Sequence, residues 1–371
     1  MKRSVAIIGT RGYPSFYGGF ETAVRHLAPY LSAHDWDVTV YGRSSESHIK
    51  PDAKVASAVR SVTTKGIESK SLSTLSYGAT AAAHASFRLK PDVALVMNVA
   101  NGYFLPLLKS RNIPTLLNVD GIEWDRQKWG KAAKTVFKIG AHLSARYATE
   151  LVFDAEAIGK RWRSEFHRDG VFIPYGGTNP GPLDAPLQLT SGTYVLVVAR
   201  FVPENTISEF LIAAEEISKT APVVIVGSSG YGGELDRTAA ALSDRNENVR
   251  WLGHVRNDKL LFALLQHAGA YFHGHSVGGT NPALVQAMAC GAPIIARDTI
   301  YNREVLGVDG LYVSPHPTAI TGEILALLRS KSLQQRARDN ALARSRAIYT
   351  WEAVCSSYEA QLRRLADARS I

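Results

Sequence analysis

Short, almost continuous apolar runs rich in β-branched residues alternate with longer amphipathic segments along the chain, and this alternation constrains its fold most. Residues 4–9 read SVAIIG, residues 20–34 have helical periodicity, and residues 37–43 read DVTVYGR. Strands of a parallel sheet that is covered on both faces have this composition, because neither face meets water. The pattern therefore predicts an α/β fold of doubly wound, Rossmann-like sheets.

The alternation is interrupted at residues 176–192, where GGTNPGPLDAPLQLTSG concentrates Gly, Pro and polar residues without periodicity. We interpret this stretch as an interdomain linker, because the strand-like run TYVLVVAR follows it directly. A chain of 371 residues is long enough for two domains, each with its own core. We expect one Rossmann-like domain over residues 1–180, a second over 181–350, and a helix over 351–371 that crosses back to the first. Their sheets would face each other across a cleft, where the carboxyl ends of the strands bind ligands.

Positive charge is concentrated in the first half of the chain. Residues 1–187 hold 24 Lys and Arg against 16 Asp and Glu, whereas residues 188–371 hold 18 against 17. A basic surface attracts anionic partners. Zinc-finger spacing and RNP-like aromatic strands are absent from the sequence, so we expect phosphates or an anionic membrane surface and no nucleic acid. A solvated basic surface without a partner is the alternative.

The cysteines and the amino-terminal residues bear on the cellular compartment. Cys290 and Cys355 lie in apolar helical segments and are expected to be buried free thiols. The chain enters a strand-like run at once, and its apolar runs are too short to span a bilayer. We expect a cytoplasmic protein that associates peripherally with the inner face of the membrane.

A glycine-rich loop in the first half joins a predicted strand to a predicted helix. The segment is IIGTRGYPSFYGGFET, residues 7–22, in which Gly18 and Gly19 precede the helix. Backbone amides at a helix start attract anions. The spacing is neither that of the dinucleotide fingerprint nor that of a Walker loop. A strained turn without a ligand is the alternative.

The second half contains a counterpart, SVGGTNPALVQAMACGAP, at residues 276–293. Asn281 and Pro282 suit the cap and first position of a helix, so this turn predicts a phosphate or diphosphate site. Arg200, at the end of a strand, can bind a diphosphate bidentately. Gln286 and Glu304 could bind the hydroxyls of a ribose. A solvated glutamine and a carboxylate favoured by the helix dipole are the alternatives.

A third stretch, NVDGIEWDRQKWG at residues 118–130, places Asp120 at the end of a strand and crowds carboxylates and tryptophans into one loop. This composition is typical of carbohydrate chemistry. HDWDV at residues 34–38 has the form of a metal–diphosphate motif, but it precedes a strand, at the sheet edge away from the predicted cleft. The HGH at residues 273–275 has no clear third ligand, so we expect no metal.

Together these stretches resemble the GT-B glycosyltransferases of family 4, with an Arg after the first strand of the second domain and the run NPALVQAMACGAPIIA…NREV. Four of them are similar more narrowly to the bacterial rhamnosyltransferase-type subgroup, which assembles cell-surface polysaccharide; they are GTRGYPSFYGGFET, NVDGIEWDRQKWG, ARFVPEN and HSVGGTNPALVQAMACGAP. The resemblance covers essentially the whole chain. It implies two Rossmann-like domains, for the acceptor and the donor respectively. It also implies retaining transfer of a sugar, with rhamnose as the first candidate, from a dTDP- or UDP-linked donor to a glycan or polyprenyl-linked acceptor. No metal or other cofactor is expected.

The sequence pattern and the resemblance together suggest roles for individual residues, of which Glu304 has no assured counterpart in the family. Those expected to act in catalysis are Asp120, Arg200 and His275. Those expected to bind the donor are Gly18, Gly19, Arg200, Asn205, Gly279, Thr280, Asn281, Gln286 and Glu304. Those expected on the acceptor side are Glu123, Trp124 and Arg126.

The sequence departs from the family pattern at several of these positions. Gln286 falls on the second Glu of an E-x7-E pair, and Gly278 stands at the first, for which His275 is a replacement if a gap is allowed. Asn205 stands at the usual Lys, and Asp120 stands where related enzymes often carry a His. A neutral amide accepts a ribose hydroxyl less strongly than a carboxylate does.

Two other functions fit the same fold. One is a nucleotide-sugar epimerase of the two-domain type, which would consume donor without an acceptor. The other is a catalytically weakened subunit that binds a nucleotide sugar, which Gln286 and Gly278 suggest.

Overall fold

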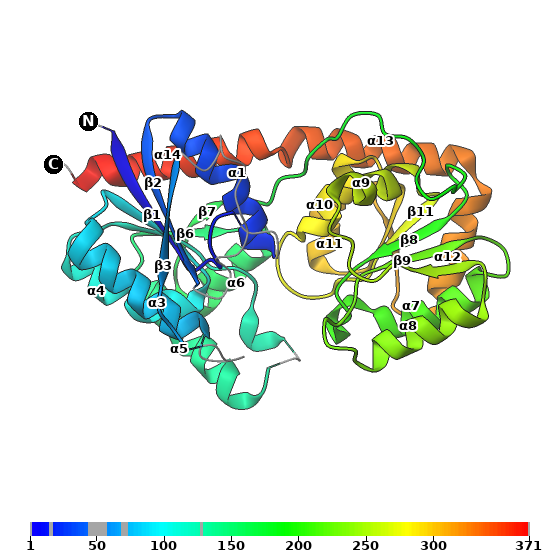
Figure 1. Cartoon of the computed structure of the whole chain (residues 1–371), viewed down its shortest axis with the longest axis horizontal. Helices are drawn as coiled ribbons and strands as arrows, with labels where there is room; N and C mark the ends of the chain where they lie inside the picture. The colour runs from blue at the N-terminus through cyan, green and yellow to red at the C-terminus, as the bar shows by residue number, and fades with distance from the viewer. Residues whose placement is uncertain (1, 15–17, 44–57, 68–72, 127–128, 370–371) are drawn as a thin grey trace. The chain divides into compact units, whose positions relative to one another are not determined.

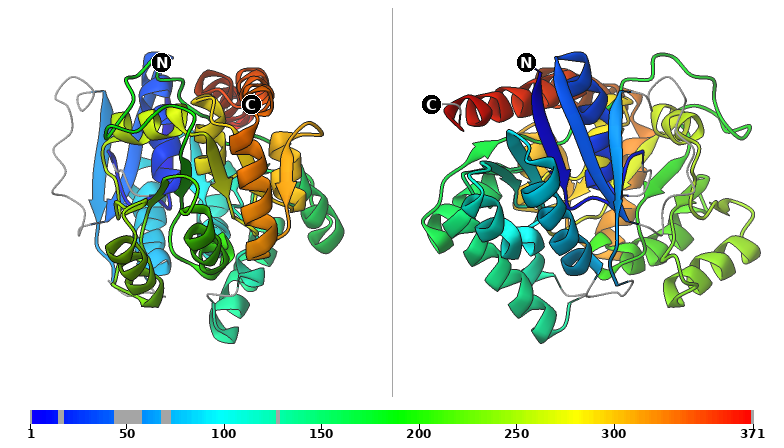
Figure 2. Two further views of the ribbon diagram at one scale, coloured as in Figure 1. Left: turned by 90° about the vertical axis from the view of Figure 1, so that its right-hand side faces the viewer. Right: turned by 60° about the vertical axis from the view of Figure 1, so that its left-hand side comes forward.

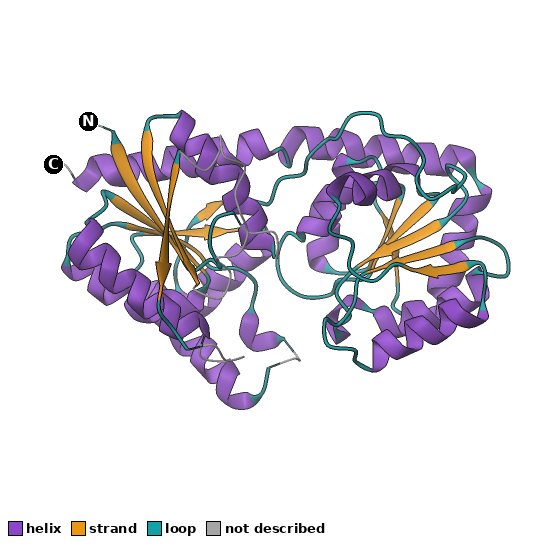
Figure 3. Cartoon of the chain, in the orientation of Figure 1, coloured by secondary structure: helices purple, strands orange, loops and turns teal. Residues whose placement is uncertain are grey.

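The computed structural model describes residues 2–14, 18–43, 58–67, 73–126 and 129–369. The chain divides into two compact α/β units (Figures 1 and 3). The first consists of Met1–Asp125, Trp129–Pro174 and Trp351–Ile371, and the second of Arg126–Lys128 and Tyr175–Thr350. The predicted doubly wound, two-domain α/β class is confirmed.

The first unit is built on a seven-stranded sheet in the order β3-β2-β1-β4-β5-β6-β7, whose neighbouring strands all pair in parallel. The strands are β1 (Arg3–Ile8), β2 (Trp36–Arg43), β3 (Val59–Thr64), β4 (Val93–Met97), β5 (Thr115–Asn118), β6 (Glu150–Phe153) and β7 (Val171–Phe172). All five residues of β4 are buried, as expected for a central strand covered on both faces.

Helices cover both faces of this sheet (Figure 2). They are α1 (Gly19–Ala33), α3 (Ser73–His84), the π-helix η2 (Ala85–Leu89), the 3-10 helix η3 (Val99–Phe104), α4 (Leu105–Ser110), the 3-10 helix η4 (Glu123–Asp125), α5 (Lys131–Tyr147), α6 (Glu156–Phe166) and α14 (Trp351–Arg369). On one face α1 and α14 share a single hydrophobic core with β1, β2 and β4.

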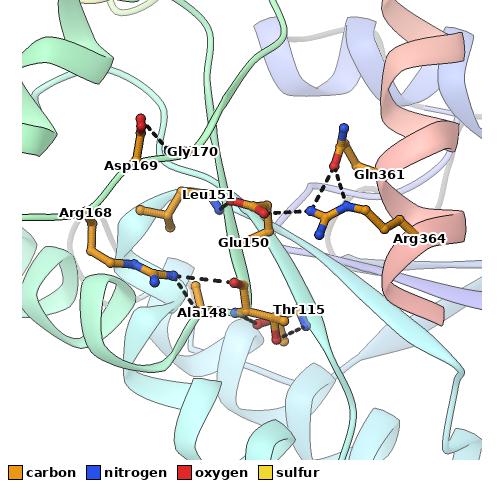
Figure 4. A network of polar contacts seen from close by, with 10 residues as sticks. Thr115, Ala148, Glu150, Leu151, Arg168, Asp169, Gly170, Gln361 and Arg364 are labelled. Atoms are coloured by element: carbon orange, nitrogen blue, oxygen red, sulfur yellow. Dashed lines mark hydrogen bonds and ion pairs between the residues drawn. The ribbon is translucent and has the colours of Figure 1, made fainter. Parts of the chain in front are cut away.

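The last helix, α14, is an integral part of the first unit. Its Tyr358 and Leu362 are buried in the same core as Val5. Asn118 Nδ2 donates to the Tyr358 hydroxyl at 2.7 Å, which ties the end of β5 to the helix. Closer to its carboxyl end, Arg364 Nη2 donates to Glu150 Oε2 of β6 at 2.6 Å (Figure 4). The sheet therefore gains one of its covering helices from residues that lie about 200 positions further along the chain.

The second unit contains a six-stranded parallel sheet in the order β10-β9-β8-β11-β12-β13. The strands are β8 (Val195–Val198), β9 (Val223–Val226), β10 (Val249–Trp251), β11 (Ala270–His273), β12 (Ile294–Arg297) and β13 (Leu311–Val313). The helices are the 3-10 helix η5 (Pro203–Asn205), α7 (Ile207–Ile217), α8 (Glu234–Arg245), α9 (Asp258–His267), α10 (Pro282–Ala289), α11 (Ile300–Leu306), α12 (Pro317–Arg329) and α13 (Lys331–Ile348). Two separate hydrophobic cores fill the two faces of the sheet.

The segment at residues 176–192, interpreted from its composition as a linker, lies against the second unit. Gln266 Nε2 donates to the carbonyl of Gly181 at 2.9 Å, and Gln266 Oε1 accepts from the amide of Leu183 at 2.8 Å. The amide of Gly192 donates to the carbonyl of His267 at 2.8 Å. Side-chain and backbone groups of α9 thus form hydrogen bonds with backbone amides and carbonyls of a stretch that has no regular secondary structure.

Among the described residues, no helix is long and apolar enough to cross a membrane. Both cysteines are buried free thiols, as predicted.

Removing the packing of α14 should destabilise the first unit. Leu362 is fully buried, so Leu362→Ala is expected to lower the free energy of unfolding by about 2–5 kcal/mol through lost burial and a residual cavity. Ile67→Ala, at a position that is 61% exposed in the same unit, is the matched control and should change it by less than about 0.5 kcal/mol. Chemical denaturation measures both. Equal effects of the two substitutions would show that α14 does not contribute to the core.

Candidate functional site

Residues predicted to bind the donor gather at one edge of the second unit's sheet. Strand β11 lies between β8 and β12, and all three run parallel. Arg200, which is exposed, follows β8, and His275 follows β11. Loops at the carboxyl ends of adjacent parallel strands lie next to one another, and ligands of open α/β sheets bind there.

Asn205 and His275 form one hydrogen-bonded pair at this edge. Asn205 Nδ2 donates to the carbonyl of Arg200 at 2.8 Å, which orients the amide so that Oδ1 faces His275 Nδ1 at 2.6 Å. Nδ1 is therefore the protonated ring nitrogen, because the amide oxygen can only accept. Burial and the nearby His273 hold the pKa of His275 well below its usual range. Asn205 and His275 thus form a neutral pair.

The loop between β11 and α10 is held in place by its own polar groups. The amide and the hydroxyl of Ser276 both donate to the carbonyl of Glu204, each at 2.9 Å. Gly278 has a φ of +93°, a conformation that favours glycine. Asn281 caps α10, because its Oδ1 accepts from the amide of Ala283 at 2.9 Å. Gly279 and Thr280 therefore lie in a preformed loop at the positive end of the α10 dipole.

Arg297 is a further cation at this edge that the sequence analysis did not select. It ends β12, and its Nη1 donates to Thr206 Oγ1 at 2.9 Å. Thr206 Oγ1 in turn donates to the carbonyl of Gly274, at the end of β11, at 2.6 Å. The signal was present in the sequence, because PIIAR ends with an arginine at the carboxyl end of a predicted strand.

Gln286 and Glu304, both expected near a ribose, make different contacts. Gln286 Oε1 accepts from the amide of Thr178 at 3.0 Å, and its Nε2 donates to the carbonyl of the same residue at 2.8 Å. Both ends of the amide are therefore engaged with the chain. Glu304 lies on α11, and burial raises the pKa of Tyr349, with the charge of Glu304 acting in the same direction.

In the first unit, the glycine loop leads into α1 at Gly18 and Gly19, although residues 15–17 lie outside the described residues. Glu21, in the first turn of α1, is buried, and its Oε1 accepts from the amide of Arg11 at 3.1 Å. A carboxylate of the chain itself thus lies in the helix turn that was expected to meet a phosphate.

Asp120 follows β5 in a strained conformation, with a φ of +63°. Its Oδ2 accepts from Asn98 Nδ2 at 2.9 Å, and its amide donates to Asn118 Oδ1 at 2.9 Å. Asn98 itself follows β4, so the carboxylate is held between the ends of two neighbouring strands. A carboxyl group in a fixed orientation is suited to stabilising developing positive charge.

The residues expected on the acceptor side are largely buried. Glu123 Oε2 accepts from Trp129 Nε1 at 2.7 Å. Trp124 is 8% exposed and packs edge-on against Phe166, with ring centroids 5.8 Å apart. Arg126 borders residues 127–128, which lie outside the described residues.

The aspartates of the HDWDV stretch lie at the amino-terminal end of β2, where the side chain of Asp35 is 90% and that of Asp37 49% exposed. Over the part of the chain that the structure describes, no group of three or more His, Cys, Asp or Glu side chains could hold a metal ion. Independence from metal stays a prediction.

The matches to protein families divide the chain close to the first boundary between the two units. Residues 192–330 match the family described as glycosyl transferases group 1, and residues 2–178 match a domain of unknown function, DUF1972. The match to glycosyl transferases group 1 thus falls within the second unit. Arg200, Asn205, His275, Arg297 and the loop before α10 all lie within the matched range.

Curated proteins to which the chain is similar include two mannosyltransferases. O-antigen chain mannosyltransferase B of Escherichia coli is 25% identical over 186 residues, which cover 49% of this chain and 48% of the relative. Phosphatidyl-myo-inositol mannosyltransferase of Mycobacterium leprae is 30% identical over 213 residues, which cover 54% of this chain and 55% of the relative. The chain spans about half the length of the curated relatives it matches.

Solved structures match the fold over nearly the whole chain. Sucrose-phosphate synthase of Thermosynechococcus elongatus superposes with a TM-score of 0.80 at 17% identity, covering 99% of this chain and 100% of that one. Anabaena HepE in complex with UDP gives 0.73 at 14% identity, covering 98% and 100%. At these identities the likeness concerns the fold, which is that of GT-B glycosyltransferase structures.

Acidification should destabilise the protein partly through His273. The His273 residue is 4% exposed, and its Nδ1 lies 3.3 Å from the hydroxyl oxygen of Tyr271. Burial lowers the pKa of His273 to about 3. An unfolded histidine has a pKa of about 6.5, so between these values the unfolded state binds more protons. The stabilising contribution of neutral His273 is present above about pH 6.5 and is lost as the pH falls toward 3.

His273→Asn, which is neutral at every pH, should therefore weaken the dependence of the unfolding midpoint on pH between about 7 and 4.5. Urea titrations at several pH values measure the slope. His26, whose pKa burial lowers to about 4, should leave a residual slope in the variant. An unchanged slope would contradict the assignment.

Proposed function

We propose that the chain is a glycosyltransferase that moves a sugar from a nucleotide-diphosphate donor to a glycan or glycolipid acceptor. The observation that carries the proposal is the coincidence of two findings in the second unit. The group 1 glycosyltransferase match covers residues 192–330, and within it Arg200, the Asn205–His275 pair and the capped start of α10 meet at one sheet edge.

The chemical task of this edge would be to stabilise the leaving nucleotide diphosphate. Negative charge develops on that group as the glycosidic bond of the donor breaks, and preorganised cations and backbone dipoles lower the barrier. Arg200 would supply the cation, while Gly279, Thr280 and Asn281 would present backbone groups at the positive end of α10. Because Asn205 and His275 are neutral, the proposal places the catalytic positive charge on Arg200, with Arg297 close to the same strands.

His275 would position the donor by accepting a hydrogen bond, and it would not contribute a positive charge. Its Nδ1 proton is committed to Asn205, and its pKa is held well below the usual range. A neutral imidazole can accept a hydroxyl hydrogen bond at neutral pH. We propose that it contacts the donor sugar, where the E-x7-E pattern usually supplies a carboxylate.

In the first unit, Asp120 is our candidate for stabilising charge near the reacting sugar, because its carboxylate is oriented by Asn98. We place the acceptor near Glu123 of the same unit and near Arg126, which follows it in the chain and is grouped with the second unit. The burial of Trp124 against Phe166 makes it a packing residue as well, so direct stacking on an acceptor would require it to move. The amides of Gly18 and Gly19 are proposed as further contacts to the donor phosphates.

For the donor we propose rhamnose carried by dTDP or UDP, with retention of configuration, on the basis of the subgroup resemblance. Mannose is the competing sugar, because two relatives are named mannosyltransferases. A polyprenyl-linked acceptor fits the basic first half of the chain. On α5 the side chains of Lys131, Lys138 and Arg146 are exposed and could meet an anionic membrane surface from the cytoplasmic side.

The first experiment is release of nucleotide diphosphate from dTDP-rhamnose and from common UDP- and GDP-sugars, with and without a lipid-linked acceptor extract and with and without EDTA. Release that the acceptor stimulates and EDTA leaves unchanged is the expected result. Release without acceptor, together with a changed free sugar, would favour the epimerase. Binding of every donor with turnover of none would favour a weakened binding subunit, which the neutral Asn205–His275 pair also fits.

Arg200→Ala should lower kcat/KM by about 10²–10³ by removing the cation that neutralises the leaving group. Arg329→Ala removes an exposed arginine at the last turn of α12 and is the matched control, with activity close to that of the unaltered protein. Steady-state kinetics with the active donor measure both. A loss of less than about threefold for Arg200→Ala would remove Arg200 from the proposed mechanism.

A further inference from the structure

The two places where the chain passes between the units are joined by backbone pairing. The chain enters the second unit at Tyr175 and leaves it after Thr350. Gly177 forms a parallel bridge with Thr350, and its amide donates to the carbonyl of Tyr349 at 2.8 Å. The entering and leaving segments therefore run side by side within the second unit.

This paired crossover lies directly against α10. A Cβ atom at Gly177 would meet the Cβ of Ala289 at 2.7 Å and the carbonyl oxygen of Val285 at 2.8 Å. Real Cβ contacts are not this short, so the close approach requires glycine. The helix whose first turn is proposed to bind the diphosphate is thus in van der Waals contact with the crossover.

Gln286 fastens the two together. From the middle of α10 it forms the reciprocal pair with the amide and the carbonyl of Thr178, at 3.0 and 2.8 Å. Its Nε2 also lies 3.2 Å from the sulfur of Cys290. A side chain that binds one N–H and one C=O at the same time needs one acceptor and one donor, and a primary amide has both.

A carboxylate at this position would lose half of the pair. Its oxygens only accept, so one of them would face the carbonyl oxygen of Thr178 without a proton between them. Pairing with both the amide and the carbonyl of Thr178 therefore explains why Gln, and not the Glu that the resemblance leads one to expect, stands at position 286.

We propose that Gln286 is a positioning residue whose amide clamps the crossover to α10 and thereby holds the first turn of that helix in the geometry that binds the nucleotide diphosphate. The inference rests on the proposed function, because it assumes that this turn binds a diphosphate. It differs from a direct ribose contact by Gln286, and the two roles predict opposite effects for one substitution.

Gln286→Glu is that substitution, and the probe is UDP, followed by dTDP, titrated calorimetrically at about pH 7.5 and about pH 5. At the higher pH the carboxylate repels the Thr178 carbonyl, and the dissociation constant is expected to rise about tenfold. Burial raises the pKa of such a carboxyl, and once protonated it can again accept from the amide and donate to the carbonyl. At the lower pH the constant should return to within about threefold of the unaltered protein.

Gln266→Glu is the matched control. Gln266 forms the same kind of reciprocal pair with the neighbouring backbone, at Gly181 and Leu183, but from α9. This variant should share the pH-dependent loss of thermal stability and keep its nucleotide affinity. Gln286→Met, which cannot form the pair at any pH, should bind weakly at both.

Other groups near the clamp do not imitate this pH profile. Burial raises the pKa of the Cys290 thiol to about 11 and also raises that of Tyr349, so both stay protonated in this range. On α13, which packs against α10, Arg338 and Arg344 stay charged. His267 of α9 contacts the carbonyl of Leu183 in the unaltered protein as well, so comparing each variant with that protein at the same pH removes any contribution from His267.

Tighter nucleotide binding by Gln286→Glu at about pH 7.5, weakening on acidification, would overturn the proposal in favour of a ribose ligand. Affinity equal to that of the unaltered protein at both pH values would also overturn it, and so would an equal loss in Gln266→Glu. If the unaltered protein binds no nucleotide diphosphate, the proposed function itself fails. A pH-dependent melting temperature of Gln286→Glu would then still report the clamp as a structural feature only.

Discussion

Parallel pairing of β8, β11 and β12 brings the candidate donor residues together, and the remaining features of the site depend on it. Parallel strands end at the same edge of the sheet. Strand pairing alone therefore brings together Arg200, His275 and Arg297, although Arg200 and Arg297 lie about 100 residues apart in the sequence. The sheet is buried on both faces by the two cores of the second unit, which makes its register costly to shift. The geometry of the edge is therefore determined by residues that take no part in chemistry.

Burial at this edge also accounts for the charge state of the site. A Lys–Glu pair at positions 205 and 275 would require desolvation of two charges, a cost that mutual attraction often fails to recover. Asn205 and His275 avoid that cost, because an amide and a neutral imidazole need only one hydrogen bond between them. The exposed Arg200 remains as a cation next to this pair, and its backbone carbonyl accepts a hydrogen bond from Asn205. The proposed mechanism therefore relies on the charge of Arg200, with Arg297 close to the same strands, whereas a hydrogen bond holds Asn205 and His275 in place.

The general architecture could be predicted from the sequence because buried parallel strands leave a strong local signal. VALVM became β4 and PIIAR became β12, with boundaries within a residue or two. The edge strand β3 was missed, since its sequence VRSVTT is half exposed and has no continuous apolar run. The stretch at residues 176–192 makes contacts that its composition does not predict. Its composition is that of a linker, but the glutamine side chains that hold it come from α9 and α10, about 80–110 residues away. Likewise, the pairing of Gln286 with Thr178 and the burial of Trp124 against Phe166 are tertiary contacts without a local signature.

The place of α14 in the first unit has a consequence for the order in which the protein can form during synthesis. The second unit, apart from three residues near position 127, is one continuous stretch, so it can complete its core as soon as residue 350 has emerged from the ribosome. The first unit cannot, although its strands are made earlier, because Tyr358 and Leu362 belong to its core. Until then the face of β1 and β4 that α14 covers would be open to water or to chaperones. The half of the molecule that is translated first is therefore the half that finishes folding last.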